Sequence, residues 1–127
     1  MATIDDVRRI ALSLPQTSER ESRGSLDWRV ADKSFVWERP LRRADIAALG
    51  DRVPNGPVYA ARTADEGVKL ALIADSPAIY FTTPHFDGYP AVLFELDRID
   101  VAELTELITD AWLARAPRRL AAEFGTG

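Results

Sequence analysis

The chain has no cysteine, and this absence removes several kinds of site at once. Without a thiol there is no disulfide framework, no thiolate zinc site and no cysteine nucleophile. Long apolar runs are missing as well, because the longest, Leu70 to Ala74, is far too short to cross a bilayer. No charged and then apolar leader precedes the first expected helix. We therefore expect a cytoplasmic protein with no membrane partner.

Motifs of the best-known catalytic and binding folds are also missing. The sequence has no nucleophile elbow of the Gly-x-Ser-x-Gly type, no Walker loop and no dinucleotide-binding glycine fingerprint. It has no usual helix-turn-helix signature and no RNA-recognition motif. We identify no catalytic residues and expect neither a cofactor nor enzymatic activity.

The length of 127 residues predicts one domain, spanning residues 1–127. Its net charge of −4 argues weakly against a dedicated nucleic-acid-binding protein. The charge is uneven, however: residues 20–62 carry nine basic and six acidic side chains, whereas the remainder carries seven basic and fourteen acidic ones. The middle of the chain could therefore present a basic surface, and a solvated face of mixed charge is the favoured alternative.

Hydrophobic spacing and capping residues predict the secondary structure. Helices are expected at residues 4–14, 42–49, 65–74, 101–112 and 117–124, and strands at 26–30, 34–38, 58–62, 78–82 and 91–96. Any strand within residues 16–25 would be short and exposed to solvent, and residues 125–127 are expected to fray. Short turns between consecutive strands favour antiparallel pairing. The predicted fold is α+β, an antiparallel sheet of about five to six strands with helices packed on one face.

Residues 82–90 contain the highest density of unusual side chains, including the only histidine, His85. His85 could contact a ligand or act as an acid or base, and Asp87 could orient its ring. We favour a structural role, in which the ring ties the loop to backbone carbonyls, because no nucleophile or second base lies nearby in the sequence. One histidine and Asp87 without a third ligand make a poor zinc pattern, so no metal is expected.

Aromatic residues offer a second set of candidates. Phe86 and Tyr89 flank the turn at Gly88 and could stack on an unpaired base or planar ligand, or close the end of the core. Of the three tryptophans, at least two should lie in the core. Trp37 could instead form the floor of a groove, although the core is favoured. The candidate ligand-binding residues are His85, Phe86, Asp87, Tyr89 and Trp37.

An arginine-rich turn around Pro40 is the best candidate for binding an anion. Three arginines surround it where a strand ends and a short helix begins, and Arg52 and Arg62 could lie near. Guanidinium groups suit phosphate recognition through paired hydrogen bonds, which give affinity without reading a sequence. A solvated turn is the alternative. The candidate phosphate-binding residues are Arg39, Arg42, Arg43, Arg62 and, at the hairpin tip, Lys33.

The order of these features resembles the MmcQ/YjbR family of small bacterial proteins. The resemblance rests on the helix ending at Leu14-Pro15, on the hairpin from Val30 to Val36, and most strongly on the segment from Phe81 to Phe86. A strand and a long helix carrying Trp112 follow, so the match covers nearly the whole chain. Departures from the family pattern are Phe86, where tryptophan is frequent, and the turn from Asp87 to Pro90.

This resemblance implies an α+β fold similar to CyaY-like and secretion-chaperone-like proteins, and DNA binding of the kind named "double wing". It supplies no catalytic residue. We therefore expect DNA as the partner of a monomer, bound through phosphates and stacking. The alternative is a module that binds a small ligand or a protein partner through loop 82–90 and the sheet face.

Overall fold

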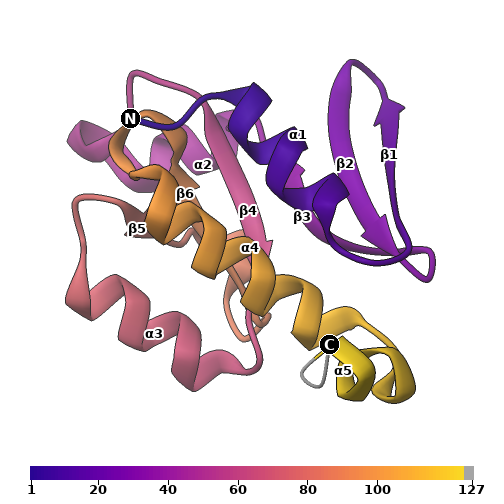
Figure 1. Ribbon diagram of the computed structural model, residues 1–127. Helices are drawn as coiled ribbons and strands as arrows, with labels where there is room; N and C mark the ends of the chain where they lie inside the picture. The colour runs from indigo at the N-terminus through magenta and orange to yellow at the C-terminus, as the bar shows by residue number, and fades with distance from the viewer. Residues whose placement is uncertain (125–127) are drawn as a thin grey trace.

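Six strands form one antiparallel sheet in the computed structural model, which describes residues 1–124 (Figure 1). The strands are β1 (Thr17–Ser22), β2 (Ser25–Val30), β3 (Lys33–Glu38), β4 (Val58–Arg62), β5 (Tyr80–Phe81) and β6 (Ala91–Glu95). The helices are α1 (Ile4–Ser13), α2 (Arg43–Leu49), α3 (Glu66–Asp75), α4 (Val101–Arg115) and α5 (Arg118–Phe124), with short 3-10 turns η1 (Gly50–Arg52), η2 (Pro84–Phe86) and η3 (Leu96–Arg98). The strand order is β1-β2-β3-β4-β6-β5, which confirms the predicted α+β fold. The fraying expected at residues 125–127 lies outside the described residues.

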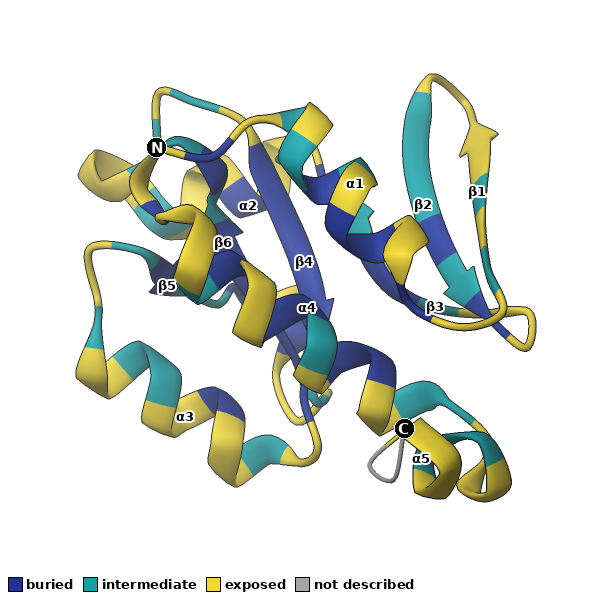
Figure 2. Ribbon diagram, in the orientation of Figure 1, coloured by how far each residue is buried: buried dark blue, intermediate teal, exposed yellow. Residues whose placement is uncertain are grey.

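Helices α1, α3 and α4 cover one face of the sheet (Figure 1). Helix α4 lies across β3 and β4, α1 packs against α4 and β1, and α3 packs against β5 and β6. The inward sides of α1 and α4 and most of β4 are buried, whereas α3 is buried only at Lys69 (Figure 2). The largest fully buried side chains of this core include Trp28, Tyr59 and Trp112. The prediction that at least two tryptophans lie in the core is therefore confirmed.

Local capping explains where the helices begin and end. The side chains of Thr3, Asp65 and Asp100 each accept a hydrogen bond from a backbone N–H in the first turn of the helix that follows. Such bonds satisfy amide groups that the helix itself leaves unpaired. Helix α1 ends just before Pro15, and α2 ends at Leu49, where the next residue, Gly50, has a φ of 57° that glycine adopts without strain.

An extra residue in β3 turns two successive side chains toward the helices. Trp28 pairs with Val36 and Arg29 pairs with Ser34, so Phe35 has no partner on β2. Phe35 and Val36 are both fully buried in the helix-covered core. Such a bulge changes which face the neighbouring residues occupy.

The opposite face of the sheet carries a smaller apolar cluster. Its buried members are Val58, Ala60, Phe86, Ala91 and Leu93. Leu41, just before α2, and Trp37 and Phe81 pack against it. Helix α2 lies behind the sheet in the view of Figure 1. The cluster thus occupies the part of the face formed by β4 and β6, and the part formed by β2 and β3 lies beside it.

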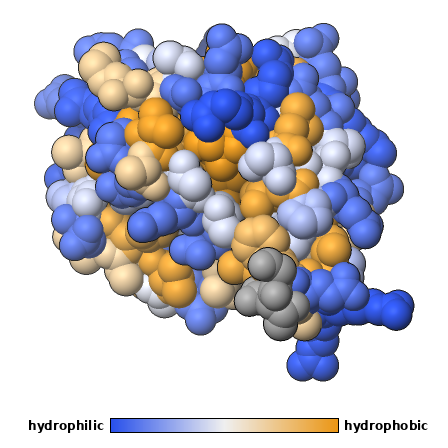
Figure 3. Space-filling model, in the orientation of Figure 1, coloured by the Kyte–Doolittle hydropathy of each residue, from blue (hydrophilic) through white to orange (hydrophobic). Residues whose placement is uncertain are grey.

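The helix-covered side of the molecule has a mixed surface. Hydrophilic side chains form most of it, and apolar ones gather between the helices (Figure 3). A shallow hollow of about 380 Å³ between α3 and α4 is lined mainly by Val68, Leu72, Leu107 and Leu113. Within residues 1–124, none of the helices combines the length and apolar character that crossing a membrane requires.

Candidate functional site

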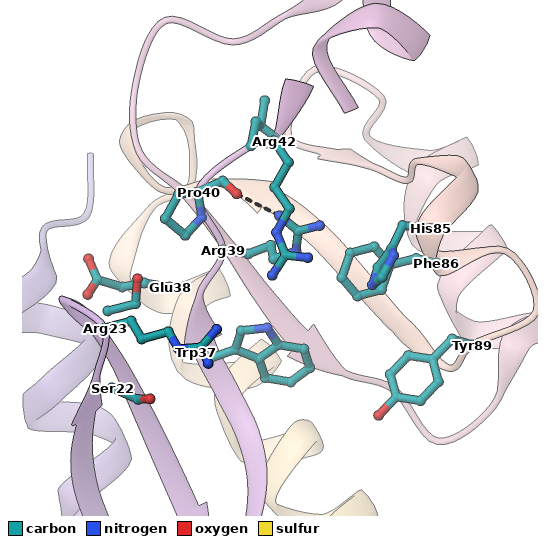
Figure 4. A pocket seen from close by; sticks show the side chains of 12 residues that line it. Ser22, Arg23, Trp37, Glu38, Arg39, Pro40, Arg42, His85, Phe86 and Tyr89 are labelled. Carbon is teal, nitrogen blue, oxygen red and sulfur yellow. Dashed lines mark hydrogen bonds between the residues drawn. The ribbon is translucent and has the colours of Figure 1, made fainter. Parts of the chain in front are cut away.

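A hollow of about 640 Å³ opens on the face of the sheet opposite the long helices (Figure 4). It lies between the β1–β2 turn, the end of β3 and loop 82–90. Its lining includes Trp37, Arg23, Arg42, His85 and Tyr89. A second hollow of about 480 Å³ extends along β2 and β3 and shares Trp37 and Tyr89 with the first. We call the two hollows together the trough.

Arg39 is buried and paired, which corrects its expected role as a free phosphate ligand. It is only 6% exposed. Its Nη1 donates a hydrogen bond of 2.6 Å to the carbonyl oxygen of Pro40, and its Nη2 lies 3.1 Å from a carboxylate oxygen of Asp45. Its guanidinium group also lies 5.3 Å from the ring centroid of Phe86. A cation held by a buried carboxylate has little charge left for an outside anion, so Arg39 stabilises the wall of the trough.

Asp45 joins two segments of that wall. Burial by itself raises the pKa of Asp45, but the backbone N–H of Arg42, the charge of Arg39 and the hydroxyl of Thr83 outweigh burial and lower this pKa. The hydrogen bond from the Arg42 backbone N–H is 2.8 Å long. Asp45 is therefore charged at neutral pH and holds the end of β3 and the start of α2 together.

The remaining predicted cations are only partly brought together. Arg42 is exposed and lines the first hollow, and Lys33 is exposed and lines the second. Arg43 is exposed but lies outside both linings. Arg62 donates a 3.1 Å hydrogen bond to the hydroxyl of Tyr89 and lies 5.0 Å from its ring centroid. Arg62 thus reaches the trough only through Tyr89.

Arg52 falls elsewhere, in a separate hollow beside Asp97 and Arg98. Sequence reasoning missed Arg23, which lies in the β1–β2 turn and lines the first hollow with no ion pair among the described residues. The run Ser22-Arg23-Gly24-Ser25 is typical of a tight turn, and this signal could have predicted both the hairpin and an arginine at its tip.

Lys69 ties down loop 82–90, a role that we had expected of the His85 ring. The Lys69 side chain is 1% exposed, and its Nζ donates hydrogen bonds to the carbonyl oxygens of Phe86, at 2.5 Å, and Tyr89, at 3.0 Å. A carboxylate oxygen of Glu66 lies 3.6 Å away. The sequence signal for this role was a single lysine within an apolar helix. A lysine side chain is rarely buried unless its charge is satisfied.

His85 is left available to a ligand. It is exposed, lines the first hollow and packs edge-on against Phe86, with ring centroids 5.1 Å apart at 78°. In the part of the chain that the structure describes, its ring makes no hydrogen bond, and Asp87 does not orient it. Phe86 is buried at 5% exposure and closes the core, whereas Tyr89 is 41% exposed. Gly88 has the expected positive φ, at 76°.

Trp37 corrects the expectation that it belongs to the core. It is partly exposed and lines both hollows. Figure 4 shows its ring in the first of them. The alternative, in which its ring forms the floor of a groove, is the one that the structure supports. Because an indole face can stack on a planar group, Trp37 gives the trough an aromatic platform.

Basic side chains outnumber acidic ones in the trough. The basic lining residues are Arg23, Arg29, Lys33, Arg39, Arg42 and Arg115, and the acidic ones are Asp27, Asp32 and Glu38. The acidic groups are occupied: Asp27 accepts hydrogen bonds from Arg29 and Ser34, and Asp32 accepts one from Arg20. Glu38 accepts one of 2.6 Å from the Leu26 backbone N–H. Four lining cations therefore have no carboxylate partner in residues 1–124, namely Arg23, Lys33, Arg42 and Arg115, whereas the one lining carboxylate without a cationic partner there is Glu38.

Comparison with known proteins places these features in a family context. A family model described as YjbR matches residues 12–114. Uncharacterized protein Rv2570 of Mycobacterium tuberculosis and Uncharacterized protein Mb2600 of Mycobacterium bovis are each 55% identical over 127 residues, which cover 98% of this chain and 96% of the relative. The crystal structure of Deinococcus radiodurans protein DR2400, with a DUF419 domain, matches with a TM-score of 0.68 at 19% identity, over 98% of this chain and 89% of that one. This structural likeness shows a shared fold.

Proposed function

The chain belongs to the YjbR family, and on this basis we propose that it is a non-enzymatic nucleic-acid-binding protein. The trough holds phosphates on its free cations and stacks a base on Trp37. One observation carries the proposal: Arg23 and Arg42, which have no ion pair in the described chain, line the same hollow as a partly exposed tryptophan. DNA binding is also what the resemblance to the MmcQ/YjbR family implies.

Each part of the hollow suits one part of a nucleotide. Guanidinium groups bind phosphate oxygens through paired hydrogen bonds, and their contacts with the phosphate backbone are independent of base sequence. Stacking of a base on an aromatic side chain contributes about 1–3 kcal/mol and tolerates any base. His85 and Tyr89 border the same space and add two further rings. The combination favours affinity over sequence specificity.

A small aromatic anion is the second candidate, favoured by the size of the first hollow. Its volume of about 640 Å³ falls within the range of roughly 300–1,000 Å³ that is typical of small-ligand pockets. A free nucleotide would use the same tryptophan and the same arginines. Competition between a free nucleotide and DNA separates the two candidates, because a small-ligand pocket would prefer the nucleotide.

Two neighbouring arginines at the start of α2, Arg42 and Arg43, give a matched test of the proposal. Fluorescence anisotropy of labelled single-stranded and duplex DNA, at low and at raised salt, would compare the wild type with Arg42→Ala and Arg43→Ala. We expect the wild type to bind and to lose affinity steeply with salt, with a logarithmic slope of about 0.7–0.9 per phosphate contact. Arg42→Ala should bind more weakly with a shallower slope, and Arg43→Ala should resemble the wild type.

Two results would count against this account. Absence of binding by the wild type at low salt would end the proposal. Equal losses in Arg42→Ala and Arg43→Ala would show a diffuse attraction to positive charge instead of a contact within the hollow. Thermal unfolding of both variants checks that the fold is retained, which we expect because both side chains are exposed.

A further inference from the structure

We infer that the trough binds an unpaired strand of at least two successive nucleotides, with phosphates at both ends and a base on Trp37 between them. This inference rests on the proposed function and names its ligand more closely. A duplex would be bound weakly or only through its ends.

The trough is continuous across its two hollows. Its two hollows share five lining residues, namely Ser22, Ser25, Trp37, Glu38 and Tyr89. Trp37 therefore lies where the hollows meet, with open space extending from it in both directions. A single nucleotide would occupy only one of these directions, whereas a chain of nucleotides can follow both.

Cations without a carboxylate partner in residues 1–124 line both hollows of the trough. Arg23 and Arg42 line the first hollow, and Lys33 and Arg115 line the second. Arg115 donates its Nε hydrogen to the carbonyl oxygen of Ser34 at 3.2 Å, an interaction that leaves its terminal amino groups directed to no carboxylate in residues 1–124. Arg29 is excluded from this role because it is paired with Asp27 at 2.8 Å. Two separate phosphate sites on either side of one aromatic platform match the repeat of phosphate, base and phosphate along a strand.

Access to the Trp37 ring is restricted by the walls of the hollow. Trp37 is only partly exposed and lies within a hollow, so a base must leave its neighbours to reach the indole face. Bases in a duplex are already stacked and paired, and extruding one costs a few kcal/mol. Bases of a single strand reach aromatic side chains without that cost. The position of Trp37 therefore favours an unpaired strand.

The walls of the trough are also fixed before a ligand arrives. Buried Lys69 holds the carbonyl groups of loop 82–90, and the buried Arg39–Asp45 pair holds the segment that leads into α2. A preorganised site loses little conformational freedom when it binds a ligand. A flexible single strand can change its own conformation to fit such a site.

The test compares three probes on one protein: thymidine monophosphate, an oligothymidylate and a duplex of the same length. Anisotropy measures the oligothymidylate, and competition measures the other two. We expect the oligothymidylate to bind about tenfold or more tightly than either, because stacking and a second phosphate contact add together. Lys33→Ala and Arg115→Ala should each weaken the oligothymidylate several-fold and leave thymidine monophosphate unchanged. Arg118→Ala, on α5 outside the trough, should match the wild type.

The possible results separate the inference from the proposed function. Unchanged binding of thymidine monophosphate by the variants shows that the fold and the Trp37 platform are intact. Equal affinity of the wild type for duplex and single strand, or wild-type affinity for the oligothymidylate in both Lys33→Ala and Arg115→Ala, would overturn the inference while leaving nucleic-acid binding in place. Absence of binding to every DNA probe would overturn the proposed function itself.

Discussion

The two faces of the sheet use the same residue type in opposite ways. On the helix-covered face, Trp28 and Trp112 are fully buried, and their indole N–H groups donate to the carboxylate of Glu19 and the carbonyl oxygen of Pro15. On the other face, Trp37 is partly exposed, and its N–H has no partner among residues 1–124. Two tryptophans thus have every group satisfied within the fold, while the third retains a ring face and a donor for a ligand.

Arg39 and Arg42 repeat this contrast within one turn. Arg39 is neutralised by Asp45 inside the protein, whereas Arg42 lies in the open hollow without an acidic partner in the described chain. The comparison shows that residue type alone does not tell a structural side chain from a candidate ligand-binding one in this protein. The burial of a side chain and its pairing with a neighbour do make that distinction, and substitutions can test both.

The largest effect is expected from opening the helix-covered core. Trp28→Ala should lower the free energy of unfolding by about 3–5 kcal/mol, because it leaves a large cavity and removes the bond to Glu19. The matched change Trp37→Ala, at a partly exposed position beside the smaller cluster, should lower it by clearly less. Urea denaturation measures both. Equal losses would mean that Trp37 belongs to the core after all.

Breaking the Arg39–Asp45 pair should have the next largest effect. Asp45→Ala leaves the Arg39 guanidinium buried without its counter-ion, and loss of one partner of a buried pair costs about 3 kcal/mol or more. Asp51→Ala, a change at an exposed aspartate in η1, is the control and should be close to neutral. A small effect of Asp45→Ala would show that the pair is dispensable to the wall of the trough.

A smaller loss is expected from releasing loop 82–90. Lys69→Met keeps the length of the side chain but leaves the carbonyl groups of Phe86 and Tyr89 without their donor, at a cost of about 1–3 kcal/mol. Hydrogen exchange of the loop amides should accelerate. Lys33→Met alters the exposed lysine at the hairpin tip and should leave both stability and exchange unchanged. Unaltered exchange in Lys69→Met would contradict the proposed anchoring.

Acid should weaken the wall of the trough in a predictable direction. The pKa of Asp45 is lowered in the folded protein, so the unfolded state binds its proton first as the pH falls. The stability that Asp45 contributes is therefore present above about pH 4, the usual range of a free carboxyl, and is lost as the pH falls through the lower folded value. Asp45→Asn should show a shallower decline of unfolding free energy below this pH than the wild type. Parallel declines would refute the linkage.

The parts of the fold that the sequence predicted correctly are those set by interactions between residues close together in the chain. Capping at Thr3 and Asp100 and the apolar face of α4 have local causes, and they appear where the sequence places them. The bulge at Phe35 could not be predicted, because it depends on how β2 and β3 pair. The expected strand at residues 78–82 is reduced to Tyr80–Phe81, where only β6 is its partner.

The sequence predicted several residues of the candidate site, but it did not predict how they are placed relative to one another. Arg42, His85 and Tyr89 were identified from the sequence and line one hollow. The burial of Arg39 was not predictable, because it requires the carboxylate of Asp45 to fold back from α2 onto the strand end. The anchoring by Lys69 was missed for the same reason, since its partners are carbonyl groups seventeen and twenty residues further along the chain.

Intrinsic tryptophan fluorescence tests the central claim most directly, because Trp37 is the one tryptophan of three that is not fully buried. Titration of the wild type with an unlabelled oligothymidylate at low salt should quench the emission to saturation, and added salt should reverse the quenching. Trp37→Phe, which keeps an aromatic platform, should still bind in competition assays but should lose the fluorescence change. Quenching of the same size in Trp37→Phe, or none in the wild type under conditions of binding, would contradict the claim that a strand lies on the Trp37 face of the sheet.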